Sequence, residues 1–174
     1  AFVVGLGAAR AIPEVLTLAE QLSAPIVHTL PVAGKIPWQH PLAVGSMGPG
    51  GSEAASRLLE EADWIFRIGA NWWPEEGTPR FGFRVMALDV RPERLGQGVG
   101  AHFGLVGDAA ELLPSLTAMV SPRSREAWGA RVAHVRAEWM NRLVEEAAEH
   151  AGGPSPRRQA PGSLHPAAVI GALS

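Results

Sequence analysis

Short apolar runs alternate along the chain with stretches in which apolar residues recur at helical spacing. The runs have the length of buried strands and lie at Phe2–Val4, Ile26–Thr29, Trp64–Ile68, Arg84–Leu88 and His102–Val106. Helical spacing is seen from Pro13 to Leu22, from Ala55 to Ala62 and from Leu112 to Leu116. Because strands that alternate with helices imply right-handed crossovers and a mostly parallel sheet, we expect an α/β fold.

Residues 30–50 interrupt this alternation. They are rich in Pro and Gly and contain Lys35, Trp38 and His40. We expect a long irregular connection there, and such connections in compact domains are often functional. Ser52 and Asp108 each stand before a helical segment, and their side chains predict N-caps.

The C-terminal part follows a different pattern. Residues from Ser124 to His150 predict one long helix, whose apolar face carries Trp128, Val132, Val135, Trp139 and Leu143. The chain begins inside a strand and ends inside a new apolar segment, so we expect a piece of a longer protein. We predict a domain at residues 1–120, a connecting helix at 121–150, a linker at 151–164 and the start of another domain at 165–174.

Composition narrows the class of protein. Hydrophobic residues make up 47% and charged residues 18% of the 174, which is typical of a globular chain. The net charge of -2 gives no electrostatic footprint for nucleic acid. The absence of cysteine excludes disulfides and thiolate metal sites, and it is compatible with a reducing cytoplasm. No apolar run approaches the roughly 18 residues that a membrane span needs.

Three glycine-rich or acidic positions are candidates for ligand binding. Gly5 and Gly7 follow a strand and precede a helix, where glycines let the backbone approach a phosphate. Arg10 replaces the third glycine of that fingerprint, which argues against a conventional NAD site, and a tight turn without ligand is an equal alternative. The loop 45–51 could lie against an extended ligand or pack at a domain boundary. Asp89 could accept ribose hydroxyls or simply begin a turn.

The chain offers no catalytic constellation. None of its six histidines pairs with another His or a carboxylate at metal-ligand spacing, and no Gly-x-Ser-x-Gly elbow occurs. Trp72 and Trp73 follow Asn71, and one of them could stack on a flat ligand, although loop anchoring is the favoured interpretation. We therefore expect no catalytic residue, no metal site and no turnover by this chain alone.

The motifs occur in an order that is similar to a known family. They are Val4–Ala8, Leu18–Glu20, Ala24–Thr29, Gly34–Pro37, His40–Gly45, Ala62–Trp64, Ile68–Gly69, Leu88–Val90 and Gly107–Ala109. In this order they resemble the central domain of thiamine diphosphate-dependent enzymes. That family includes acetolactate synthase, pyruvate oxidase, oxalyl-CoA decarboxylase and benzoylformate decarboxylase.

The resemblance implies a Rossmann-like three-layer sandwich with a mostly parallel six-stranded sheet. Such a domain binds FAD in some members, ADP in others and no nucleotide in the rest. Thiamine diphosphate and Mg²⁺ would be held by flanking pyrimidine- and diphosphate-binding domains, in a homodimer or homotetramer acting on 2-oxo acids or acyl-CoA. Residues 165–174 resemble the first helix of the diphosphate-binding domain.

The resemblance also implies a set of nucleotide-contacting positions. They are Gly5, Leu6, Gly7, Thr29, Gly45, Met47, Gly48, Gly69, Ala70, Asn71, Asp89, Val90, Gly107 and Asp108. Asn71 departs from acetolactate synthases, which carry Arg there, and the Gly69–Pro74 loop is closer to the pyruvate oxidase version. Two alternatives stay open, a stand-alone nucleotide-binding flavoprotein-like module and a purely structural spacer.

Overall fold

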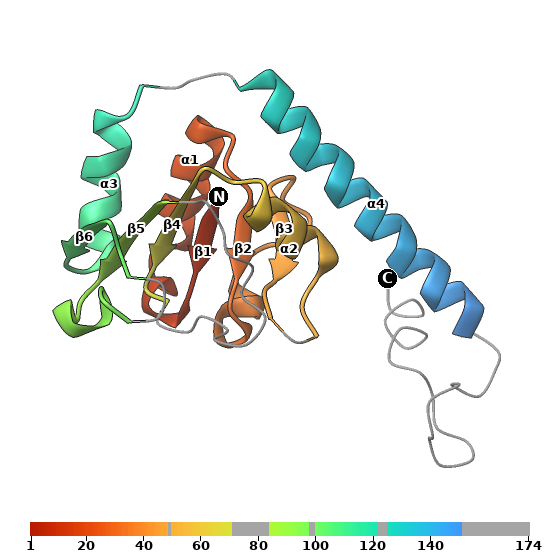
Figure 1. The fold of residues 1–174 in the computed structure, drawn as a ribbon, viewed down its shortest axis with the longest axis horizontal. Coiled ribbons are helices and arrows are strands. Elements are labelled where there is room, and N and C mark those ends of the chain that lie inside the picture. The colour runs from red at the N-terminus through yellow and green to blue at the C-terminus, as the bar shows by residue number, and fades with distance from the viewer. Residues whose placement is uncertain (49, 71–83, 98–99, 122–124, 151–174) are drawn as a thin grey trace, which may run out of the picture. The chain divides into compact units, whose positions relative to one another are not determined.

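Six parallel strands form a single sheet in the computed structural model of the chain (Figure 1). The structure describes residues 1–48, 50–70, 84–97, 100–121 and 125–150, without the side chains of 149 and 150. The strands are β1 (Phe2–Val4), β2 (Ile26–His28), β3 (Ala43–Ser46), β4 (Trp64–Ile68), β5 (Arg84–Asp89) and β6 (Phe103–Val106). Their order is β3-β2-β1-β4-β5-β6 and every pairing is parallel. The predicted α/β fold with a six-stranded sheet is confirmed.

Helices connect the strands or follow them. They are α1 (Ile12–Leu22), α2 (Glu53–Glu60), α3 (Ala109–Met119) and α4 (Glu126–His150), with short 3-10 turns η1 (Leu6–Ala8), η2 (Leu30–Lys35) and η3 (Pro92–Arg94). The chain forms two compact units, Ala1–Val135 and Arg136–Ser174, and the boundary between them falls within α4. No helix in the described part of the chain is long and apolar enough to cross a membrane.

One face of the sheet is covered by α1 and α3. The strand residues on this face are Phe2, Val4, Ile26, Phe66, Ile68 and Leu88. They pack with Val15 and Leu18 of α1 and Leu113 of α3 in one apolar cluster, and all three helical residues are buried. This side of the molecule therefore holds the main core.

The second face carries the strand residues that alternate with those of the first. Val3, Val27, Arg67 and Ala87 stand in register across it, and all four are buried. The crossover through α2 runs across the sheet in the opposite direction to the crossover through α1. Because both are right-handed, α2 lies on this second face. The two helical layers and the sheet form the expected three-layer sandwich.

The prediction for residues 30–50 was wrong in one respect. They contain η2 and the strand β3, not only irregular backbone. Gly45 lies within β3 at a φ of 93°, and the β2–β3 register shifts there, from Ile26 opposite Ala43 to His28 opposite Ser46. A bulge of this kind adds one residue to the strand, which breaks the alternation that sequence patterns depend on.

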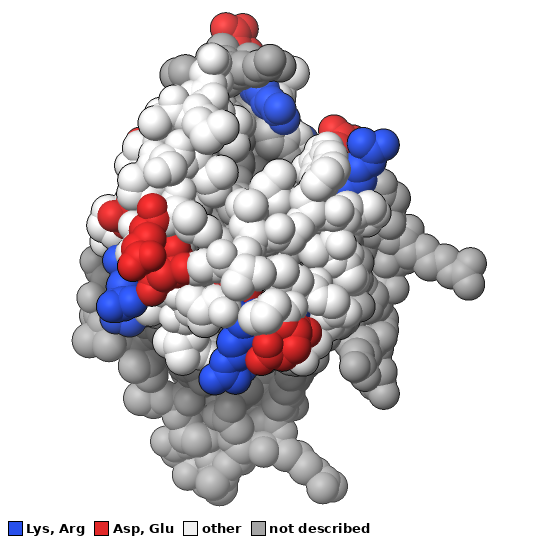
Figure 2. All heavy atoms as spheres, turned by 90° about the vertical axis from the view of Figure 1, so that its left-hand side faces the viewer, with Lys and Arg blue, Asp and Glu red and all other residues white. Residues whose placement is uncertain are grey.

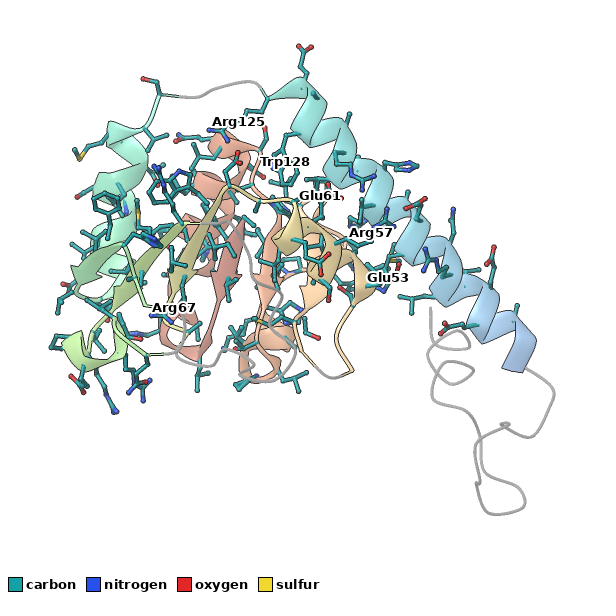
Figure 3. The ribbon with its side chains drawn as sticks, viewed as in Figure 1. Glu53, Arg57, Glu61, Arg67, Arg125 and Trp128 are labelled. Carbon is teal, nitrogen blue, oxygen red and sulfur yellow. The ribbon has the colours of Figure 1, made fainter. Side chains whose placement is uncertain are left out.

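The long C-terminal helix is confirmed from Glu126 onward. Within the first unit, Val132 and Val135 of α4 are buried, as its apolar pattern predicts. Arg131 binds Glu61 at the end of α2 through Nε to Oε2 at 2.8 Å and through a second, shorter contact. Figure 3 places Glu61 in line with Arg57 and Glu53 along α2. Ser124, Trp72, Trp73 and residues 151–174 lie outside the described residues.

Strand β6 forms one edge of the sheet. Phe103 and Val106 are more than half exposed, and Met119 at the end of α3 is 82% exposed. Figure 2, which faces this side of the molecule, shows a broad uncharged surface with charged side chains gathered at its margins.

Candidate functional site

The predicted site residues gather at one edge of the sheet. Because all six strands are parallel, their carboxyl ends lie together, on the lower side of the sheet in Figure 1. Each described member of the predicted set lies in the last residues of a strand or directly after one. Asn71 lies outside the described residues. The carboxyl edge is thus the place where a ligand of this fold class would bind.

The turns after β1 and β4 pack directly against each other. Gly7 N donates to Gly69 O at 3.0 Å, and Gly5 N donates to Ile68 O at 2.9 Å. A Cβ at Gly5 would lie 2.5 Å from the Ala70 Cα, and one at Gly7 would lie 2.8 Å from the Gly69 Cα. These glycines are required for close packing between two turns. The Gly7 amide is already used, which supports the tight-turn interpretation of this motif.

Asp108 after β6 is also fully engaged. One carboxylate oxygen accepts from Ala110 N at 2.8 Å and caps α3, and the other accepts from Arg10 Nη2 at 2.5 Å. The bond from Ala110 and, after it, the Arg10 guanidinium lower the pKa of Asp108. The predicted N-cap is confirmed, and Arg10, which replaces the third glycine, joins the β1 turn to α3.

Asp89 at the end of β5 differs from Asp108. The residue is only 7% exposed, and its Oδ1 accepts from Arg91 N at 2.9 Å. The second carboxylate oxygen has no hydrogen-bond partner among the described residues. A carboxylate at a strand end with an oxygen to which no described residue donates can accept the hydroxyls of a ribose.

Apolar side chains are exposed at the same edge of the sheet. Leu6 follows β1, Leu30 follows β2 and Val90 follows β5, and their exposed fractions are 58%, 70% and 58%. Exposed apolar groups at a strand edge suit the face of a flat ligand or the surface of another domain. Sequence reasoning included Leu6 and Val90 but missed Leu30.

The residues that directly follow β2 and β3 are buried at this edge. Thr29 and Met47 are 7% and 6% exposed, and Met47 N donates to His28 O at 3.2 Å. Burial lowers the pKa of His28, which favours the neutral imidazole. Gly48 has a φ of 92° and accepts from Gly51 N at 2.7 Å. These residues shape the edge but offer it few free polar groups.

Sequence reasoning missed Arg67, a buried arginine beneath this edge. Its side chain lies on the second face of β4 and is 2% exposed. Burial lowers its pKa, and the nearby Asp89 carboxylate opposes that shift. The signal was present, because a single Arg interrupts the apolar run Trp64–Ile68 at an inward-facing position. Figure 3 shows Arg67 at the opposite end of the sheet from Arg125 and Trp128.

A cavity of about 850 Å³ opens at the amino ends of β4 and β5. Trp64, Arg84 and Trp128 line it, and the Arg84 guanidinium lies 5.5 Å from the centre of a Trp64 ring. None of the predicted site residues that the structure describes lines this cavity. Among the residues that the structure describes, no three His, Asp or Glu side chains gather to hold a metal ion.

An open parallel sheet with an acidic strand end and glycine turns at its carboxyl edge defines a Rossmann-like α/β domain. A family model described as "Thiamine pyrophosphate enzyme, central domain" matches residues 1–116. The chain belongs to this family, as the resemblance predicted.

Similar proteins support the assignment to this family. Sulfoacetaldehyde acetyltransferases of Rhodobacter capsulatus and Roseovarius nubinhibens are 30% and 31% identical, each over 80% of this chain. The probable acetolactate synthase large subunit of Methanocaldococcus jannaschii is 32% identical over 68% of this chain. The matched segments cover 26%, 25% and 21% of these relatives, so the chain spans about a quarter of their length.

Proposed function

We propose that the carboxyl edge of this central domain binds an adenine-containing nucleotide, either FAD or ADP. The observation that carries the proposal is Asp89, a buried residue at the strand end whose second carboxylate oxygen accepts no hydrogen bond from any described residue. A ribose hydroxyl can donate to that oxygen, while Leu6 and Val90 offer apolar surface to a ring. The glycines of the β1 turn contribute by close packing, and the Gly7 amide, which donates to Gly69 O, is not assigned a bond to the nucleotide.

The whole protein, in this proposal, is a thiamine diphosphate-dependent enzyme acting on 2-oxo acids or acyl-CoA. Two of the relatives are named as acetyltransferases and one as an acetolactate synthase, which favours transfer of an acyl group. Thiamine diphosphate and Mg²⁺ are assigned to flanking domains, in a homodimer or homotetramer. The cysteine-free composition is compatible with the cytoplasm, where we place the enzyme.

Replacement of Asp89 tests the nucleotide site directly. In titration calorimetry with ADP and with FAD, we expect the 174-residue chain to bind at least one of them. The Asp89→Asn variant keeps the shape of the side chain but loses the charged acceptor, and its affinity should fall by about 10- to 100-fold.

Asp63→Asn is the matched control, because Asp63 is an exposed aspartate directly before β4, at the amino edge. It should leave the affinity unchanged. Equal affinity of the wild type and the Asp89→Asn variant would rule out Asp89 as a contact. If the wild type binds neither nucleotide, the domain is a structural spacer, an alternative that the packing of Gly5 and Gly7 against Gly69 and Ala70 favours.

A further inference from the structure

Arg67 occupies a position where the fold calls for an apolar residue. It lies on β4 between Val3 of β1 and Ala87 of β5, both buried, and its own side chain is 2% exposed. A buried guanidinium is strongly destabilising unless its donors are hydrogen-bonded. The partners of Arg67 therefore indicate what the residue does.

The hydrogen-bond partners of Arg67 among the described residues are backbone carbonyls of one segment. Nη1 donates to Gln97 O at 2.9 Å, and Nη2 donates to Arg94 O at 3.0 Å and to Leu95 O at 3.2 Å. These carbonyls come from the end of η3 and the turn that follows it. Arg94 O also accepts from Gln97 N at 3.3 Å, and Leu95 O accepts from Ala101 N at 3.0 Å, so Arg67 adds a second donor to both and holds the turn after η3 from inside the sheet.

The same segment begins at the candidate site. Arg91 N donates to Asp89 Oδ1, and Arg94 N donates to Arg91 O at 3.1 Å, so one turn joins Asp89 to the carbonyls that Arg67 holds. Val90, exposed at the edge, lies between these two anchors. The segment is fixed by Asp89 at its start and by Arg67 at its end.

We propose that Arg67 is a positioning residue for the nucleotide site, because it fixes the 91–97 turn that holds Asp89 and Val90 in their binding orientation. This role rests on the proposed function of the carboxyl edge. A planar guanidinium presents several donors in fixed directions, and three carbonyls are bound here through two nitrogens. A lysine ammonium is a compact point charge, and a methionine has no donor at all.

Two variants and two measurements test the role. Arg67→Lys keeps the charge, and Arg67→Met keeps much of the volume without any donor. Hydrogen exchange of the amides of residues 91–97 is followed without ligand, and ADP and FAD affinities are measured by calorimetry on protein whose fold is checked by circular dichroism. Arg84→Met is the control, because Arg84 lies on Trp64 at the amino edge.

We expect Arg67→Met to accelerate exchange in residues 91–97 and to weaken nucleotide binding by about tenfold, with Arg67→Lys intermediate and Arg84→Met unchanged. If Arg67→Met does not fold, the Arg67→Lys variant must show both effects in reduced form. A folded variant with faster exchange but wild-type affinity would assign Arg67 a merely structural role and overturn the proposal. Unchanged exchange would overturn it independently of any ligand. Failure of the wild type to bind ADP and FAD would instead overturn the proposed function, and the positioning role with it.

Discussion

Asp89 and Asp108 stand at the ends of neighbouring strands, yet their carboxylates are in different states. Both oxygens of Asp108 accept hydrogen bonds, from Ala110 N and from Arg10. Asp89 accepts one bond, from Arg91 N, and no described residue donates to its second oxygen. The difference identifies Asp108 as a helix cap and leaves Asp89 as the acceptor that a ligand can use.

His28 gives a prediction about pH at the same edge. Burial lowers its pKa below the ordinary value of 6.5, so the unfolded chain binds the proton more readily than the folded chain. As pH falls through 6.5, protonation therefore favours unfolding. We expect the free energy of unfolding to fall between pH 7.5 and 5.5 more steeply in the wild type than in the His28→Gln variant, measured by urea denaturation.

Two other groups with lowered pKa values, the Ala1 amine and Glu61, do not affect the comparison between the wild type and the His28→Gln variant. Burial lowers the pKa of the Ala1 amine to about 5, but that group is common to both proteins and cancels in the difference. Hydrogen bonding to Arg131 lowers the pKa of Glu61, whose contribution is lost only as pH falls below its ordinary value of 4.5. Parallel pH profiles for the two proteins would contradict the assignment to His28.

At the scale of elements, the paired turns after β1 and β4 define the shape of the edge. Gly69 has a φ of 57°, and a Cβ there would lie 2.5 Å from the carbonyl carbon of Gly7. The two turns can approach this closely only without side chains. Gly5 and Gly7, which the sequence offers as phosphate-binding residues, therefore allow the turns after β1 and β4 to pack closely.

The Gly69→Ala variant tests this packing. Strain at positive φ together with the backbone clash should lower the free energy of unfolding by roughly 2–3 kcal/mol. Gly129→Ala in α4 is a matched control, because a Cβ there meets nothing within 4 Å, and alanine should stabilise the helix by about 0.5–1 kcal/mol. Equal effects of the two substitutions in chemical denaturation would show that the turns do not pack as described.

The elements that sequence patterns predicted are those with regular periodicity. Strands β1, β2 and β5 and helix α1 were found because their apolar residues recur regularly, and β4 was found although Arg67 interrupts its apolar run. Strand β3 was missed because the bulge at Gly45 breaks its alternation. The location of the site followed from strand ends alone, since parallel strands bring their carboxyl ends to one edge.

The long-range partners could not be predicted in the same way. Arg67 meets carbonyls about thirty residues away, and Gly7 meets a turn more than sixty residues away. Such pairs depend on strand order, which periodicity does not specify. Sequence reasoning therefore placed Asp89 at the edge. It could not predict which carboxylate oxygen of Asp89 is hydrogen-bonded, or that Arg67 binds the turn that follows.

At the scale of the whole molecule, the sheet presents two distinct ends. The carboxyl end carries Asp89 and the exposed Leu6, Leu30 and Val90. The amino end carries the cavity with Trp64 and Trp128. The chain belongs to a family of central domains of thiamine pyrophosphate enzymes. It spans about a quarter of the length of its relatives. We propose that a nucleotide binds at the carboxyl end and not at the amino end.

An NMR titration of the isotope-labelled chain with ADP and, separately, with FAD distinguishes the two ends of the sheet. We predict that at least one of the nucleotides shifts the amide signals of Leu6, Leu30, Asp89 and Val90 in a saturable manner, while the indole signals of Trp64 and Trp128 stay in place. Shifts confined to the two indoles, or no saturable shift with either nucleotide, would contradict a nucleotide site at the carboxyl edge.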